Sequence, residues 1–368
     1  MDFPAPRNLS DLISDGALTQ AGVDAAWLAD IGEISGVEFS GEQVRVHRSG
    51  KDPLDLPGRL VATIQNQEWT WEQDFPQLEL PELHNGVPAS DALIAAARTL
   101  NGNVPILLAP TENLTRAIAV GFHPAPGPTR PALIAGLAAV VNTKNGHLDI
   151  HRALMGFAAA RGLGIRNEGD VLTLSDGTEV TLAGSRVIDV AGGLSLADVR
   201  ADARFFSAEH QLFYEGRWPN AELKVDLNRG KALVDQRLQA KAIVIATITD
   251  QEWTWAWADP HLPPNESANL RQFGLDHGIP ALFQEQCPLP EALKLDLTDA
   301  AKPILGMWTH GYCPLNAYTT AVVLLDAPEL HLPAPTEAAV AATWQAPIDP
   351  ELDLDRAQSA YRAHRQIS

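Results

Sequence analysis

The stretch ATIQNQEWTW (residues 62–71) returns as ATITDQEWTW (residues 246–255), at a constant offset of 184 residues and with eight of ten positions identical. Agreement of this length indicates an internal repeat. In each copy an apolar segment and an alternating Trp and Thr segment flank a residue that tolerates a left-handed backbone, Asn66 or Asp250. This pattern predicts a β-hairpin in each copy, two strands joined by a tight turn.

The position of the turn fixes which residues face each other. We place Asn66 and Gln67 at the centre of the first turn, and Asp250 and Gln251 at the centre of the second. A tryptophan then has a small neighbour such as alanine across the strand, and two threonines can share their hydroxyl groups. The predicted pairs in the second hairpin are Ile248 with Trp253, Thr247 with Thr254 and Ala246 with Trp255, and the first hairpin has the same pairs.

The repeated tryptophans admit two interpretations. They are either core residues whose indoles cover a helix layer, or a platform on which a base or a sugar stacks. We favour the core, because large aromatic side chains are more often buried than displayed. After Trp255 the second copy adds Trp257 on the same face, whereas the first copy has Gln73 at that position.

The segments around the hairpins predict the fold class. A helix precedes each copy, near residues 20–30 in the first, and helical stretches with a β-rich ending follow. We expect an α+β protein of two related units, each with a leading helix, an antiparallel sheet of hairpins and closing helices on one face. The predicted division is 1–143 for a diverged first unit, 144–194 for a partial unit, 195–331 for the second unit, and 332–368 for a Pro/Ala-rich tether with a terminal helix.

The partial unit contains a helix, HLDIHRALMGFAAARG, and a hairpin signal, VLTLSDGTEVTL, with Asp176-Gly177 as its turn. It is either a truncated third copy or an accessory hairpin that extends one of the sheets. His147 and His151 begin its helix four residues apart, but two histidines without a third ligand do not make a metal site. No metal or other cofactor is expected. The terminal helix, from Pro350 on, either docks or frays.

Composition bounds the class of protein. A chain of 368 residues with 45% hydrophobic residues is long enough for two domains with cores of their own. The net charge of -19 repels a nucleic-acid backbone, and no basic stretch compensates for it. We find no signal peptide and no apolar run of about eighteen residues, and two cysteines fit a reducing compartment. We therefore expect a cytoplasmic protein that binds neither nucleic acid nor membrane.

Residues from about 203 to 328 resemble a family of uncharacterised bacterial proteins known only as a domain of unknown function. The resemblance rests on three stretches, ARFFSAEHQLFYEG, EWTWAWADPHLPP and a helix that ends at LDHGIP. The first copy shares only its EWTW with this pattern. The resemblance implies an α+β fold and a bacterial cytoplasm, and it brings no activity, cofactor or site residue.

No catalytic motif is present: we find no glycine-rich phosphate loop, GxSxG elbow, HExxH or paired-cysteine metal site. Whether the protein is an enzyme therefore stays open. Two places in the second unit hold candidate ligand-binding residues. The segment MWTHGYC (residues 307–313) could face the second tryptophan strand across an aromatic pocket, and one helix carries two polar side chains four residues apart. The candidates are Trp255, Trp257, His310 and Tyr312 for the pocket, and His210 and Tyr214 on the helix.

Three functions are compatible with these features. The leading expectation is a non-catalytic binding or adaptor protein built from an internal duplication, whose partner is an unidentified protein or small molecule. The first alternative is an enzyme that acts on a small molecule through a His-containing aromatic pocket in the second unit. The second alternative is an immunity-like protein whose acidic surface neutralises a basic partner.

Overall fold

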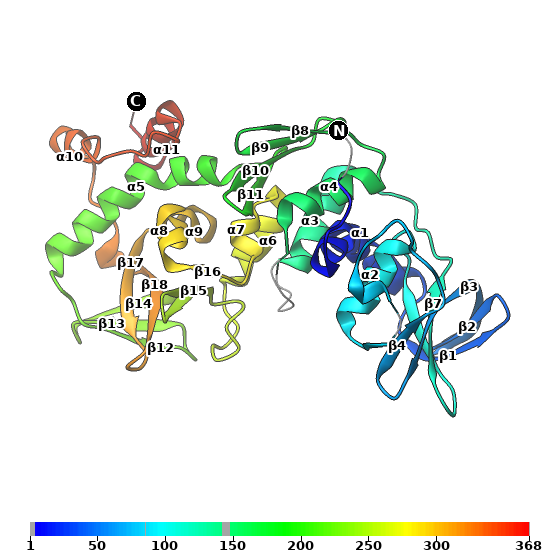
Figure 1. Cartoon of the computed structure of the whole chain (residues 1–368). Helices are drawn as coiled ribbons and strands as arrows, with labels where there is room; N and C mark the ends of the chain where they lie inside the picture. The colour runs from blue at the N-terminus through cyan, green and yellow to red at the C-terminus, as the bar shows by residue number, and fades with distance from the viewer. Residues whose placement is uncertain (1–3, 85, 142–147, 368) are drawn as a thin grey trace. The chain divides into compact units, whose positions relative to one another are not determined.

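The structure is a computed structural model that describes residues 4–84, 86–141 and 148–367 (Figure 1). The chain divides into two compact units, Met1–Val187 and Ile188–Ser368. Helices accompany an antiparallel sheet in each unit, so the α+β prediction is confirmed. None of the described helices is long and apolar enough to cross a membrane.

The first unit opens with helix α1 (Leu9–Asp30), which begins earlier than predicted because Asn8 accepts a hydrogen bond from the Asp11 N–H and caps it. Helices α2 (Asp91–Leu100), α3 (Thr129–Val140) and α4 (Ile150–Ala160) pack on α1. A seven-stranded sheet runs in the order β1 to β5, with β7 beside β3 and β6 beside β7. Its strands are β1 (Ile34–Ser40), β2 (Gln43–Arg48), β3 (Lys51–Gln65), β4 (Glu68–Trp71), β5 (Val87–Pro88), β6 (Ile106–Pro110) and β7 (Thr115–Val120).

The second unit opens with helix α5 (Leu196–Arg217), whose first turn is closed by a capping box of Ser195 and Asp198. Its seven-stranded sheet has the same order, β12 to β16, with β18 beside β14 and β17 beside β18. The strands are β12 (Leu223–Asp226), β13 (Lys231–Val234), β14 (Leu238–Thr249), β15 (Glu252–Trp255), β16 (Gln286–Pro288), β17 (Thr309–Pro314) and β18 (Thr319–Asp326). The helices between β15 and β17 are α6 (Ala268–His277), α7 (Pro280–Phe283), α8 (Leu289–Lys294) and α9 (Leu297–Leu305).

The two sheets also agree in register. Strand β3 shifts register against β7 between Leu60 and Ala62, and β14 shifts against β18 between Val244 and Ala246. These positions are separated by the same offset as the two EWTW copies. A bulge bends a strand, so each long strand pairs with one hairpin before the bulge and with the tryptophan hairpin after it.

Both tryptophan hairpins have the predicted turns and pairs. The central turn residues have positive φ, 51° and 66° at Asn66 and Gln67, and 50° and 64° at Asp250 and Gln251, as a two-residue hairpin turn requires. The pairs in the second hairpin are Ala246 with Trp255, Thr247 with Thr254 and Ile248 with Trp253, and the first hairpin repeats them. The hairpin prediction is therefore confirmed residue by residue.

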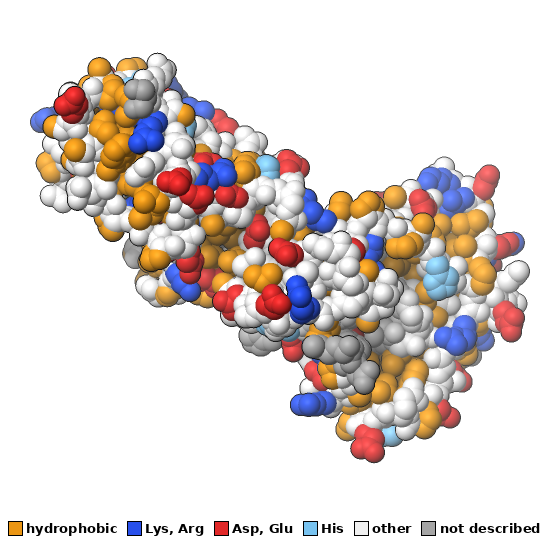
Figure 2. Space-filling view, turned by 90° about the horizontal axis from the view of Figure 1, so that it is seen from above, with side chains coloured by type: hydrophobic (Ala, Val, Ile, Leu, Met, Phe, Trp, Pro, Cys, Tyr) orange, Lys and Arg blue, Asp and Glu red, His pale blue; other side chains and the backbone are white. Residues whose placement is uncertain are grey.

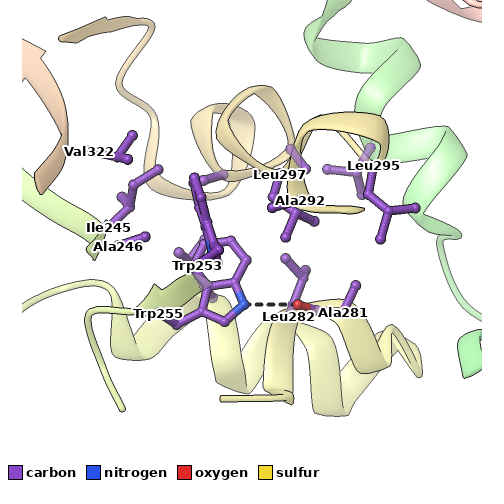
Figure 3. Packing of buried hydrophobic residues seen from close by; sticks show 14 of the residues in the cluster. Ile245, Ala246, Trp253, Trp255, Ala281, Leu282, Ala292, Leu295, Leu297 and Val322 are labelled. Carbon is purple, nitrogen blue, oxygen red and sulfur yellow. Dashed lines mark hydrogen bonds between the residues drawn. The ribbon is translucent and has the colours of Figure 1, made fainter. Parts of the chain in front are cut away.

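The paired tryptophans are core residues (Figure 3). Trp253 and Trp255 are each 1% exposed and meet edge to face, with ring centroids 5.3 Å apart. The Trp255 Nε1–H donates to the Ala281 carbonyl at 2.9 Å, and Trp71 donates in the same way to the Glu82 carbonyl at 3.0 Å. The core interpretation is confirmed, and the stacking-platform interpretation is wrong.

The middle segment forms a sheet of its own. Strands β8 (Ile165–Glu168), β9 (Val171–Leu174), β10 (Glu179–Ala183) and β11 (Arg186–Val190) pair in sequence order. The turn between β9 and β10 lies at Asp176-Gly177, where Gly177 has a φ of 90°. The alternative in which this hairpin extends one of the larger sheets is therefore wrong.

The C-terminal segment packs on α5 and belongs to the second unit. It contains helices α10 (Glu337–Thr343) and α11 (Leu354–Arg365). Tyr361 of α11 is fully buried and donates a hydrogen bond to Glu209 at 3.0 Å, and Arg356 forms ion pairs with Asp198 and Asp202 at 3.0 and 2.7 Å. The terminal helix thus docks, and the segment that we predicted to be a tether does not leave the unit.

Candidate functional site

A hollow in the second unit has a volume of about 560 Å³. We call it the second-unit hollow. Residues 225–231 of the β12–β13 hairpin form one wall, and residues 239–242 and Val244 of β14 form the next. Residues 326–328 after β18 and residues 262–266 of the loop before α6 complete it. Its lining mixes apolar side chains with acidic and basic ones.

A hollow of about 570 Å³, the first-unit hollow, is formed by the corresponding part of the first sheet. Phe39, Gly41 and Glu42 at the β1–β2 turn form one wall, residues 57–60 of β3 the next, and residues 119–121 at the end of β7 the third. Asn101 and Val104, which follow α2, and His123, which follows β7, complete it. The loops that close the two hollows therefore differ, while the sheet segments are the same.

Backbone hydrogen bonds show that the two sheet frameworks are equivalent. The Gly58 N–H donates to the Glu42 carbonyl in the first hairpin turn at 2.8 Å. The Ala242 N–H, at the corresponding position of β14, donates to the Gly230 carbonyl at 2.8 Å. Each bond links the turn of the first hairpin to an inner residue of the long strand, β3 or β14, and the hollow lies beside this contact.

The two hollows differ in charge. In the second sheet four charged residues form a row across four neighbouring strands, each paired with the next. In order they are Asp226, Lys231, Lys241 and Asp326. The corresponding row in the first sheet is Ser40, Gln43, Pro57 and Gly121. Like charges directly opposite each other repel, and for the lysines this is offset by the flanking aspartates and by Glu266, 3.0 Å from Lys241. The charged row across the strands is therefore specific to the second unit, whereas Glu42 and Arg59 are the acidic and basic residues of the first-unit hollow.

The tryptophan strand does not line the aromatic pocket that we predicted, because its side chains are packed into the core. Trp255 is in the core, and Tyr214 is 7% exposed among the apolar residues on the other side of the sheet. Trp257 is half-buried against the core, with the Arg271 guanidinium 5.5 Å from its ring centroid. We therefore correct the assignment of Trp255 and Tyr214 from ligand-binding residues to core residues.

His310 and Tyr312 do not meet the tryptophans either. They lie on β17, and strands β18 and β14 separate them from Trp255 on β15. Three strand spacings amount to about 14 Å, so MWTHGYC does not form the predicted pocket with the tryptophan strand. Instead, the His310 N–H donates to the Gln211 side chain of α5 at 3.3 Å, and Tyr312 is 51% exposed.

Beside His310 lies a buried polar cluster that the sequence did not reveal. The Lys302 ammonium, which is fully buried, is 2.7 Å from Asp299 and 2.5 Å from the Ser207 hydroxyl, and that hydroxyl donates to Asp299 at 2.8 Å. Burial alone would raise the pKa of Asp299, but attraction to Lys302 and the hydrogen bonds from Lys302 and Ser207 lower it below its usual value. Burial, followed by the charge of Lys302, lowers the pKa of His310 to about 3.

His210 lies on α5 and is 7% exposed. Burial, with smaller effects of the Lys302 and Arg365 charges, lowers its pKa to about 3. It lines a smaller hollow next to α11. Among the described residues, no three His, Cys, Asp or Glu side chains are placed to hold a metal ion. Of the two histidines considered for a metal, His151 is exposed and His147 lies outside the described residues.

The sequence offered one signal for the two larger hollows. The constant offset aligns Gly58 with Ala242 and so identifies equivalent positions on the long strands. The loops that close the hollows come from elsewhere in the chain and have no counterpart in the repeat, so the hollows themselves were missed.

Comparison with known proteins identifies part of the second unit. Residues 197–328 match a family described as "Family of unknown function (DUF6882)". This range agrees with the resemblance found in the sequence, and it contains every lining residue of the second-unit hollow. Neither the curated proteins nor the solved structures contain a match.

Proposed function

We propose that the chain is a non-catalytic binding protein, built from an internal duplication, that holds small molecules in the first-unit and second-unit hollows. One observation carries the proposal: hollows of about 570 and 560 Å³ lie against the same three sheet segments in the two units. Small-molecule sites have volumes of roughly 300 to 1,000 Å³ and combine apolar walls with a few polar groups. Both hollows have these properties.

Because the two hollows differ in the charge of their linings, we expect them to bind different kinds of ligand. In the second-unit hollow, Lys241 and Asp326 face each other across β14 and β18, which suits a small molecule with both a cationic and an anionic group. In the first-unit hollow Arg59 already donates to Asn101, and the other ionisable lining residues are Glu42 and His123. Fewer charged side chains line this hollow than the second-unit hollow, so it suits a less charged molecule. Since the sheet segments correspond but the lining residues differ, we expect the two hollows to bind two different ligands and not the same one.

The enzyme alternative has less support. With pKa values lowered to about 3, His210 and His310 are neutral and weakly basic near pH 7, whereas a general base works best with a pKa near the operating pH. The immunity-like alternative needs a continuous acidic face. On the face shown in Figure 2, acidic side chains alternate with basic and uncharged ones. The bacterial and cytoplasmic expectations remain part of the proposal, supported by the composition and by the resemblance.

The proposal is tested by thermal unfolding of the full chain against a library of metabolite-sized compounds. A compound at a hundredfold excess over its Kd stabilises the folded state by about 2.7 kcal/mol, which raises Tm by roughly 5 °C or more. Each stabilising compound is then measured with Glu42→Trp, which fills the first-unit hollow, and with Asn228→Trp, which fills the second.

Glu179→Trp, at an exposed position of β10 that lines neither hollow, is the matched control. We expect one of the two filling variants to remove each stabilisation and the control to keep it. Stabilisation that survives both filling variants, or a library without any stabilising compound, would contradict the proposal.

A further inference from the structure

Arg59 of β3 lines the first-unit hollow and has no carboxylate partner. Its side chain is exposed, and its Nη2–H donates to Oδ1 of Asn101, which lines the same hollow. Among the residues that the structure describes, no Asp or Glu oxygen lies within 4.0 Å of the guanidinium. The N–H donors on Nε and Nη1 therefore have no protein acceptor, and a ligand can reach them.

A small network orients this guanidinium. Asn101 follows the last residue of α2, and its Nδ2–H donates to the Ala97 carbonyl at 2.8 Å. Its Oδ1 accepts from Gln73 at 3.4 Å as well as from Arg59. The carbonyl groups at the end of a helix also attract a cation. The position of the Arg59 guanidinium is therefore set before a ligand binds.

The two copies of the repeat differ at this network. The constant offset aligns Arg59 with Ile243 and Gln73 with Trp257. Ile243 is 2% exposed in the core of the second unit, and Trp257 packs against the same core. Neither of them lines the second-unit hollow. The sheet framework thus forms with apolar residues at both positions, so the fold does not require the charge of Arg59.

The rest of the lining suits an apolar molecule with one negative charge. Phe39, Leu60 and Val104 supply apolar walls, and the exposed ring of His123 has a further N–H donor. Glu42 brings a carboxylate to the same hollow, so a second negative charge on the ligand would be repelled. A guanidinium matches both oxygens of a carboxylate with two parallel N–H groups. A carboxylate therefore fits better than a phosphate monoester, which carries about −1.5 to −2 charges at pH 7.

We propose that the first-unit hollow binds a small monocarboxylate with an apolar body, whose carboxylate accepts hydrogen bonds from Arg59. The inference rests on the proposed function, because it takes the first-unit hollow as a ligand site. Arg59 is then the residue that selects the charged group, and Asn101 and Gln73 are positioning residues that hold it.

Fluorine NMR of the full chain with 4-fluorophenylacetate and with 4-fluorophenylacetamide tests the proposal, because the two compounds have the same ring and nearly the same size but only the first is charged. We expect wild type to bind the carboxylate about tenfold more tightly, since hydrogen bonds between charged groups are the stronger ones. Arg59→Met removes the charge, so it should bind both compounds about equally. Arg59→Lys keeps the charge without the planar fork and should show a smaller preference than wild type.

Two further variants complete the test. Arg166→Met, at an exposed position of β8 that lines neither hollow, is the matched control and should keep the wild-type preference. Glu42→Trp fills the hollow and should abolish the binding of both compounds.

The outcomes separate this inference from the proposed function. Wild type that binds both compounds equally, with both lost in Glu42→Trp, would overturn the carboxylate assignment and leave the proposed function standing. A preference that survives in Arg59→Met, or tighter binding of 4-fluorobenzyl phosphate than of the carboxylate, would also overturn the assignment. So would wild type that binds neither compound. Binding that persists in Glu42→Trp would place these compounds outside the hollow and contradict both proposals.

Discussion

Replacing Asp299 by alanine tests the buried polar cluster of the second unit. The Lys302 ammonium is fully buried, and Asp299 is its only carboxylate partner within 4.0 Å among the described residues. Breaking a buried pair from one side leaves an uncompensated charge and costs about 3 to 5 kcal/mol. The Ser207 hydroxyl remains as a hydrogen-bond partner, so we expect a loss near the lower end of this range, measured by urea unfolding at pH 7.

The same cluster predicts how stability depends on pH. The pKa of Asp299 is lowered in the folded state, despite burial, by Lys302 and Ser207. Its contribution is therefore present above the unfolded value, 3.8, and is lost as pH falls through the folded value. Asp299→Ala should lose less stability than wild type on acidification. Asp276→Ala, at an exposed position of α6, is the control and should change stability by at most about 0.5 kcal/mol. A loss below about 1 kcal/mol in Asp299→Ala would refute the reasoning.

Three further predictions concern the second unit. Burial and the charge of Asp299 raise the pKa of Asp296 to about 6, so its ionised form opposes folding as pH rises from 3.8 through about 6; Asp296→Asn should therefore raise Tm at pH 7. Trp253→Ala should cost about 3 to 5 kcal/mol in denaturant unfolding, because it opens a cavity in the core. Arg356→Ala removes two partly exposed ion pairs and should cost about 1 kcal/mol, with faster hydrogen exchange confined to α11.

The hairpins were predictable because their signals are local. A two-residue turn sets the register, and the register sets every cross-strand pair, so Ala246 had to face Trp255 once Asp250 was placed in the turn. The helix start at Leu9 was missed for a related reason. Its cap is Asn8, and the apolar residues that follow Asn8 do not recur at the spacing that marks one face of a helix.

The candidate site was less predictable because its parts are distant in the sequence. The segment MWTHGYC was chosen as a candidate site because it is rich in aromatic and histidine residues. A core strand can be equally rich in them, so this content does not distinguish the two. Trp255 turned out to be core, while His210 lines a hollow that needs His364 of the C-terminal helix. Lys302 lies within a helix with an apolar face, and nothing in its neighbourhood in the sequence indicated a buried charge.

The central claim is that the two sheet hollows bind ligands. Hydrogen exchange of the full chain, with and without a compound that raises Tm, tests it most directly. We expect slower exchange at the lining segments of one or both hollows, residues 39–42 and 57–60 in the first unit or residues 225–231 and 239–242 in the second. Protection confined to other parts of the chain would contradict the claim.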